Sequence, residues 1–215
     1  MPKKEIALKH SVILFAYLLV VWGVYRFLFR LPEEVEDVLV KPLVWLIPVF
    51  ILVHREKAKL GSIGITFKNF FPAIYFALSL GAFFAIEGLL VNYFKYGSLN
   101  FVANVGRANI IYSLGISFAT AVSEEIVFRG FLFSRLRSVF RSFWVANIIT
   151  TAAHVVINLP IVFFVWKMEL PAALIYLSLV TIFGLGAGFV YAKSENIISP
   201  ILLRVFWEWP IVLFR

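Results

Sequence analysis

Long apolar runs alternate with short polar connections along the whole chain. A helix needs about 20 mostly apolar residues to cross the hydrocarbon layer of a bilayer. On this measure the pattern predicts membrane-spanning helices near residues 11–29, 39–54, 70–94, 109–133, 142–166, 170–192 and 197–214. We therefore expect an all-α, polytopic transmembrane helix bundle of about seven spans, within a range of six to eight, that uses residues 1–215 as a single membrane domain.

Two of these runs are less regular than the others. The uncharged core of the second run, residues 42–53, is short and contains Pro48, so this run either spans the membrane or forms a re-entrant or interfacial segment. The seventh run carries Arg204 and Glu208, which is unusual for a spanning helix. In contrast, the fifth and sixth runs contain no Asp, Glu, Lys or Arg.

Composition agrees with a membrane protein. The chain is 62% hydrophobic and 15% charged, whereas a soluble domain has about 45–50% apolar and about 25% charged residues. Cysteine is absent, which excludes disulfides, thiolate catalysis and thiolate metal sites. The net charge of +8 comes from short basic clusters between apolar runs, which is typical of membrane loops, so we expect no nucleic-acid partner.

The distribution of basic residues also predicts an orientation. If the N-terminus is inside, more Lys and Arg residues fall in the inner loops than in the outer ones, as the positive-inside rule requires. The basic start of the chain and the apolar run after it are not followed by a small-residue cleavage site, so we interpret them as an uncleaved first span. We expect a multi-pass protein of the plasma (inner) membrane with a cytoplasmic N-terminus.

Three charged residues, Glu124, Glu125 and Arg129, interrupt the fourth apolar run. Such a residue costs at least about 2.5–3.5 kcal/mol at the centre of a spanning helix, so it normally faces protein or water. Positions four apart share a helix face, which predicts that Glu125 pairs with Arg129 and leaves Glu124 as a free carboxylate in apolar surroundings, suited to general-base work on water. The alternative is a solvated helix end, although the apolar run continues beyond the acids.

Two further polar sets lie in the last spans. His154 shares a helix face with Thr150 and Asn158, which predicts a polar stripe that faces a carboxylate; the alternative is a core histidine that makes one hydrogen bond between helices. Arg204 and Glu208 are also four apart and can neutralise each other, as either a structural or a functional pair.

These residues together resemble the CPBP family, which comprises CAAX-type proteases and bacteriocin-processing membrane peptidases and is also called the Abi family. "EEIVFRG" (124–130) matches its Glu-Glu-x-x-x-Arg motif. In the Phe-x-x-x-His motif Thr150 replaces Phe and His154 is kept, and in the His-x-x-x-Asn motif Arg204 and Glu208 replace His and Asn. The similarity covers about residues 110–210, the last four spans, which correspond to the conserved helical core of the family.

The resemblance implies an intramembrane glutamic endopeptidase. Glu124 would activate water, Glu125 and Arg129 would form a structural pair, and His154 would orient the water or stabilise the intermediate. The substrate would be a membrane-bound, lipidated or otherwise hydrophobic peptide, and membrane lipid would surround the protein. With no HExxH motif and few plausible ligands, we expect neither a metal nor a cofactor.

The replacement of His by Arg204 leaves two interpretations open. A guanidinium cannot exchange a proton but can donate hydrogen bonds to an oxyanion, which is compatible with a working protease. If Arg204 instead forms a salt bridge with Glu124, the carboxylate becomes a poorer base and the chain is an inactive homologue that binds a peptide or acts as an immunity or scaffold protein. A transporter that uses buried acids such as Glu87 is a third interpretation, which the absence of repeats disfavours.

Overall fold

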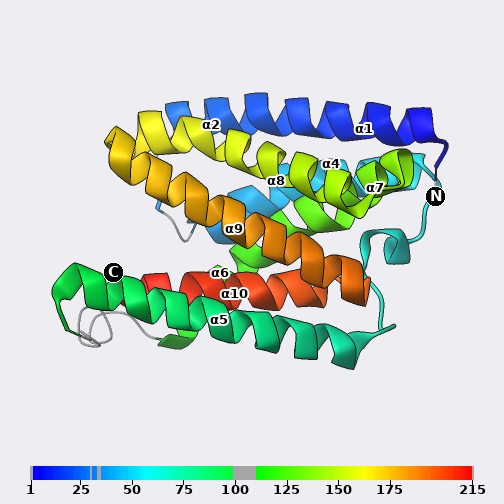
Figure 1. Cartoon of the computed structure of the whole chain (residues 1–215). Helices are drawn as coiled ribbons and strands as arrows, with labels where there is room; N and C mark the ends of the chain where they lie inside the picture. Colours follow the sequence, from blue (N-terminus) through cyan, green and yellow to red (C-terminus); the bar gives the residue numbers. More distant parts are fainter. Residues whose placement is uncertain (1, 30, 33–34, 99–109, 215) are drawn as a thin grey trace.

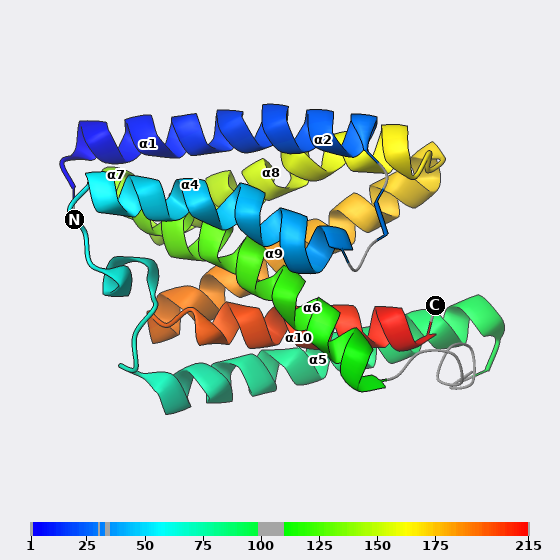
Figure 2. The same cartoon turned by 180° about the vertical axis from the view of Figure 1, so that it is seen from behind.

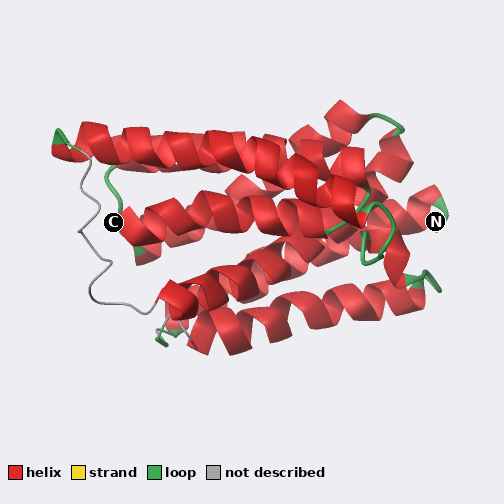
Figure 3. Ribbon diagram, turned by 90° about the horizontal axis from the view of Figure 1, so that it is seen from below, coloured by secondary structure: helices red, strands yellow, loops and turns green. Residues whose placement is uncertain are grey.

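The structure, a computed structural model, describes residues 2–29, 31–32, 35–98 and 110–214, and these are helical apart from turns and short connections (Figures 1 and 3). The elements are α1 (Lys4–Tyr17), η1 (Leu18–Trp22), α2 (Gly23–Leu28), η2 (Glu36–Val40), α4 (Lys41–Arg55), η3 (Leu60–Ile63), α5 (Phe70–Tyr96), α6 (Ile110–Glu125), η4 (Ile126–Phe133), α7 (Ser134–Phe140), α8 (Phe143–Pro160), η5 (Ile161–Val165), α9 (Leu170–Ser194) and α10 (Ile198–Phe214). The predicted all-α fold is confirmed.

Several of these elements join end to end into longer rods. Within the described residues, five rods or helices are long and apolar enough to cross a membrane: Lys4–Leu28, Glu36–Arg55, Phe70–Phe94, Phe143–Val165 and Leu170–Ser194. The second apolar run thus belongs to one continuous 20-residue helical stretch in spite of its Pro48. The rod formed by α6, η4 and α7, and the 17-residue α10, correspond to the fourth and seventh expected spans, so a count of seven stays a prediction.

The helices form a bundle with two sides (Figures 1 and 2). The rod of α1 and α2 lies along one edge, with α7 and α8 beside it, and α5 and α10 lie together along the opposite edge. Helix α9 crosses obliquely between them and packs on α8, α5 and α10, whereas α6 contacts α4 and α10. As a result α4, α6, α8 and α10 all reach the middle of the bundle.

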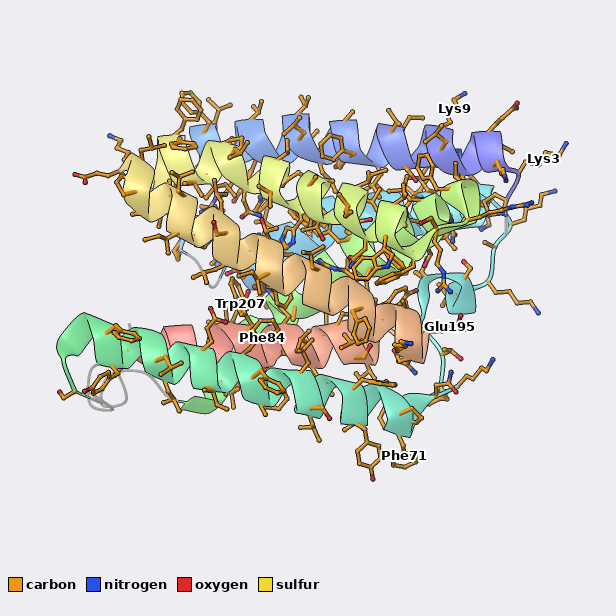
Figure 4. All side chains as sticks on the ribbon, viewed as in Figure 1. Lys3, Lys9, Phe71, Phe84, Glu195 and Trp207 are labelled. Carbon is orange, nitrogen blue, oxygen red and sulfur yellow. The ribbon has the colours of Figure 1, made fainter. Side chains whose placement is uncertain are left out.

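Two apolar clusters fill the interior. The larger one includes Trp22, Trp45 and Phe128, and the smaller one joins α5, α9 and α10 through Phe183 and Trp207. Figure 4 shows Trp207 and Phe84 in the space between these helices. Lipid tails are as apolar as leucine, so these side chains stabilise the bundle by packing rather than by removal from water. Two cations of the candidate site contact these clusters, Lys41 at Trp22 and Trp45 of the larger one and Arg204 at the rings of the smaller one.

Glycines allow α9 to approach α8 closely. A Cβ atom on Gly184 would lie 2.7 Å from Cγ2 of Thr151, and one on Gly188 would overlap the side-chain amide of Asn147. Small residues at helix crossings in membranes let backbones come together in this way. Asn147 uses the approach to donate a hydrogen bond from Nδ2 to the Leu185 carbonyl oxygen (3.0 Å).

A buried ion pair ties the N-terminal helix to α7 at one end of the bundle. Glu56 accepts hydrogen bonds on Oε2 from Nε (2.8 Å) and Nη2 (2.7 Å) of Arg135, and its Oε1 lies 3.0 Å from Nδ1 of His10. Arg135 also donates from Nη1 to the Ser62 carbonyl oxygen (3.1 Å). The start of α1, the connection after α4 and the start of α7 therefore lie on the same side of the bundle.

The beginning of α10 is fixed to the same connection. Asn196 donates from Nδ2 to the carbonyl oxygens of Thr66 and Lys68 (2.8 Å each), and its Oδ1 accepts from the backbone N–H of Ile198 (2.9 Å), which caps the helix. The backbone N–H of Ile197 donates to the carbonyl oxygen of Gly64 (2.9 Å). Gly64 has a φ of 78°, which glycine adopts without strain.

Candidate active site

Glu124 lies at the centre of a buried charged cluster. Its Oε2 is 3.1 Å from Nε2 of His154 and 2.7 Å from Nη2 of Arg204, and its Oε1 is 2.5 Å from Nζ of Lys41. Helices α8, α10 and α4 supply these three partners. The prediction of a free Glu124 in apolar surroundings is therefore wrong, because two cations from other helices reach it. The salt bridge to Arg204, one of the two outcomes left open by the sequence, is present.

The predicted pair of Glu125 and Arg129 is present. Nη1 of Arg129 donates to Oε1 of Glu125 at 3.3 Å, and both side chains are at most 1% exposed. Nη2 of Arg129 donates to the carbonyl oxygen of Gly184 (3.1 Å), and the guanidinium lies 5.5 Å from the ring centroid of Phe183. Arg129 thus links Glu125 to α9.

His154 lies between Glu124, which it contacts directly, and Arg129, the partner of Glu125. Its ring stacks on Phe128 with 4.2 Å between centroids, and its Nδ1 lies 3.5 Å from Nη1 of Arg129. A guanidinium only donates hydrogen bonds, so Nδ1 is the acceptor and the hydrogen is assigned to Nε2. His154 then donates this hydrogen to Glu124, which fixes the orientation of the carboxylate.

Two of the three guanidinium nitrogens of Arg204 contact acids. Nη2 contacts Glu124, and Nε donates to Oε1 of Glu208 at 2.5 Å, as the spacing of Arg204 and Glu208 predicts. The guanidinium lies 4.9 Å from the ring centroid of Phe183 and 5.1 Å from that of Trp207, beside these two stacked rings. Its Nη1 is buried and has no hydrogen-bond partner among the residues that the structure describes. A buried donor without a partner costs about 1–3 kcal/mol, so this atom is suited to an acceptor on a ligand.

The two cations have the same arrangement around Glu124. Lys41 lies between Glu124 and Asp37 (3.5 Å), and Arg204 lies between Glu124 and Glu208. The outer acids are more exposed than the inner one: the side chains of Asp37, Glu208 and Glu124 are 28%, 17% and 8% exposed. Lys41 therefore links Glu124 to Asp37, and Arg204 links it to Glu208. In each case the second acid is more exposed than Glu124 and lies on the same helical rod as the cation.

Sequence reasoning missed Lys41. Its position in the sequence suggests a residue of a loop, where it is only one of the basic residues counted to predict the orientation. The available signal was weak: Lys41 follows Asp37 by one helical turn and precedes Trp45 by another, at the start of an apolar run. Nothing in that local pattern indicates a partner on α6.

The remaining expected site residues lie outside the cluster. Nδ2 of Asn158 donates to the carbonyl oxygen of His154 (2.9 Å), and Oγ1 of Thr150 donates to that of Ala146 (2.6 Å). Both side chains satisfy the backbone of their own helix, so the expected polar stripe contributes only His154 to the carboxylates. Glu87 is partly buried on α5. Over the described ranges, no group of three or more His, Asp or Glu residues has an arrangement that could hold a metal ion.

The fold and the site together define a polytopic helical membrane protein with a buried cluster of acids and cations. The family model described as "Type II CAAX prenyl endopeptidase Rce1-like" matches residues 106–210. Over that segment the chain is similar to this protease family, and the resemblance to the CPBP group is confirmed. No curated protein and no solved structure matches the chain significantly. Lys41 lies outside the matched segment, which contains the other residues that contact Glu124.

Proposed function

We propose that this protein is an intramembrane endopeptidase in which Glu124 activates a water molecule to cleave a membrane-bound, hydrophobic or lipidated peptide. The match of residues 106–210 to a family of CAAX proteases supports this class of reaction. The observation that carries the proposal is the contact between Glu124 and His154 (3.1 Å) beside Nη1 of Arg204, for which the described part of the chain supplies no hydrogen-bond partner. A base, a group that orients it and a donor for an oxyanion are the parts that acyl transfer requires.

The steps follow from these groups. Glu124 accepts a proton from water while the water oxygen bonds to the scissile carbonyl carbon, and the carbonyl electron pair moves onto its oxygen. Nη1 of Arg204 donates a hydrogen bond to this oxyanion. The electron pair of the oxyanion then re-forms the carbonyl, the C–N bond breaks with its pair on nitrogen, and Glu124 returns the proton to that leaving nitrogen. A positioned general base contributes about 10²–10⁴ in rate, and one oxyanion donor about 10²–10³.

The salt bridge between Arg204 and Glu124 favours a second candidate, a homologue that binds a peptide without cleaving it. A carboxylate that is paired with two cations is a weaker base than a free one. However, the negative charge leaves Glu124 as the oxyanion forms close to it, and the same cations then stabilise the oxyanion. Part of the cost in basicity is therefore recovered in the transition state, which is why we favour the protease.

The test is cleavage by the purified protein in proteoliposomes, with a prenylated C-terminal peptide and a hydrophobic leader peptide as substrates. We expect cleavage by the wild type and none by Glu124→Gln. Glu195→Gln, which alters an exposed acid at the C-terminal cap of α9, serves as the matched control and should cleave normally. A wild type that binds either peptide but cleaves neither, with binding unchanged in Glu124→Gln, would support the second candidate instead.

We also propose an orientation with the N-terminus in the cytoplasm and the protein in the plasma (inner) membrane. The excess of basic residues in the loops on that side supports this orientation. The chain has no cysteine, so single engineered cysteines report on sidedness without a background signal.

A further inference from the structure

Lys41 is a buried ammonium group on a helix that the family match does not include. It is 7% exposed and lies at the start of α4, among apolar side chains. Taking a charge out of water costs several kcal/mol, which only good geometry with an opposite charge recovers. The Nζ–Oε1 distance of 2.5 Å to Glu124 supplies that geometry. The position of Lys41 thus depends on the acid at the centre of the site.

The surroundings of Lys41 restrict where its ammonium can lie. Nζ is 5.9 Å from the ring centroid of Trp22 and 5.5 Å from that of Trp45, and the two indoles meet edge to face. Asp37 holds the same ammonium from one helical turn before it. Cation–π contacts of this kind contribute about 0.5–2 kcal/mol each and favour one position of the charge. Lys41 is therefore a rigid contact, in contrast to a lysine that extends into solvent.

The contacts on Glu124 are divided between its two oxygens. His154 and Arg204 both contact Oε2, and Lys41 contacts Oε1. A carboxylate offers about four lone-pair sites, two on each oxygen. Both sites on Oε2 are occupied, and Lys41 takes one on Oε1. The remaining site for a water molecule is then on Oε1, next to the lysine.

We propose that Lys41 is a positioning residue of this active site, which holds Oε1 of Glu124 so that its remaining lone pair faces the attacking water. The inference rests on the proposed protease function. It adds to the site a residue from α4, outside residues 106–210, and assigns to Oε1 rather than Oε2 the acceptance of the proton.

The direction of the effect on rate separates this role from a purely electrostatic one. If Lys41 acted only as a charge that weakens the base, its removal would raise the rate of cleavage. If it positions the carboxylate, its removal lowers kcat, because a misplacement of about 1 Å costs about a hundredfold. The two mechanisms thus predict opposite signs for the same substitution.

The experiment compares Lys41→Met, which keeps length and removes charge, with Lys41→Arg and with the exposed control Lys9→Met (Figure 4). We expect Lys41→Met to lower kcat about a hundredfold with little change in KM. Lys41→Arg should recover part of the rate, and Lys9→Met should match the wild type. A structural role alone would reduce the folded yield and leave kcat of the folded protein unchanged.

The outcomes distinguish the inference from the function on which it rests. If the wild type cleaves, Glu124→Gln does not, and Lys41→Met has an unchanged or higher kcat, the positioning role is wrong and the protease stands. If the wild type cleaves no peptide, the protease is wrong and the role of Lys41 falls with it. Should Lys41→Met fail to fold, Asp37→Asn removes the other acid on Lys41; an unchanged kcat in both Asp37→Asn and Lys41→Arg would overturn the inference.

Discussion

Replacement of Glu125 by glutamine should destabilise the protein far more than the same change at Glu124. Glu125→Gln keeps the shape of the side chain but leaves Arg129 without the only carboxylate that it contacts among the described residues. Breaking a buried ion pair costs about 3–5 kcal/mol. In Glu124→Gln, by contrast, Lys41 and Arg204 each keep an acid one turn away on their own rods. The stability cost there should be clearly smaller.

Thermal unfolding in detergent, followed by tryptophan fluorescence, measures the difference. For a chain of this size about 1 kcal/mol corresponds to about 2–4 °C, so Glu125→Gln should lower Tm by about 6–20 °C. The control is Glu195→Gln, which breaks the exposed pair with Arg137 (3.9 Å) and should change Tm little. Equal falls in Tm for Glu124→Gln and Glu125→Gln would contradict the division of roles between the two acids.

Three further outcomes are expected. Arg204→Ala should lower kcat/KM at least about a hundredfold, and Arg204→Lys should restore little, because a point charge does not reproduce a planar guanidinium; cleavage assays that find no loss would remove Arg204 from the site. Gly184→Ala should lower Tm because its Cβ meets a side chain of α8, whereas Gly23→Ala, which adds a Cβ in open space, should not; similar Tm values would argue against close packing there. Cysteines placed at Lys4 and Arg137 should both resist labelling from outside intact cells, and labelling of both would reverse the orientation.

The sequence predicted contacts within one helix well. The pairs Glu125–Arg129 and Arg204–Glu208 each join residues four apart, and helical periodicity alone brings such side chains together. The all-α fold followed equally directly from the length of the apolar runs. Local geometry therefore accounts for these predictions.

Contacts between helices were predicted only in part. His154 was expected to face a carboxylate, and it contacts Glu124 of α6, but other contacts were missed. Glu124 was expected to be free because nothing near it along α6 neutralises it, yet Lys41 and Arg204 reach it from helices distant in sequence. Asn158 was expected at the site because it shares a face with His154, but its amide bonds to the backbone of its own helix. Which charges meet across helices depends on the crossing of the rods, and helical periodicity contains no information about it.

The attachment of Asn196 at the end of the bundle has a consequence for how this chain can vary. Asn196 fixes the first turn of α10 to the connection after α4 by hydrogen bonds. Arg204 lies about 12 Å further along the helix axis, and each residue turns the helix by about 100°. Deleting or inserting one residue between them would rotate the guanidinium away from Glu124 while the start of α10 stayed in place. Between Asn196 and Arg204, a change in the number of residues should therefore be tolerated less well than a substitution.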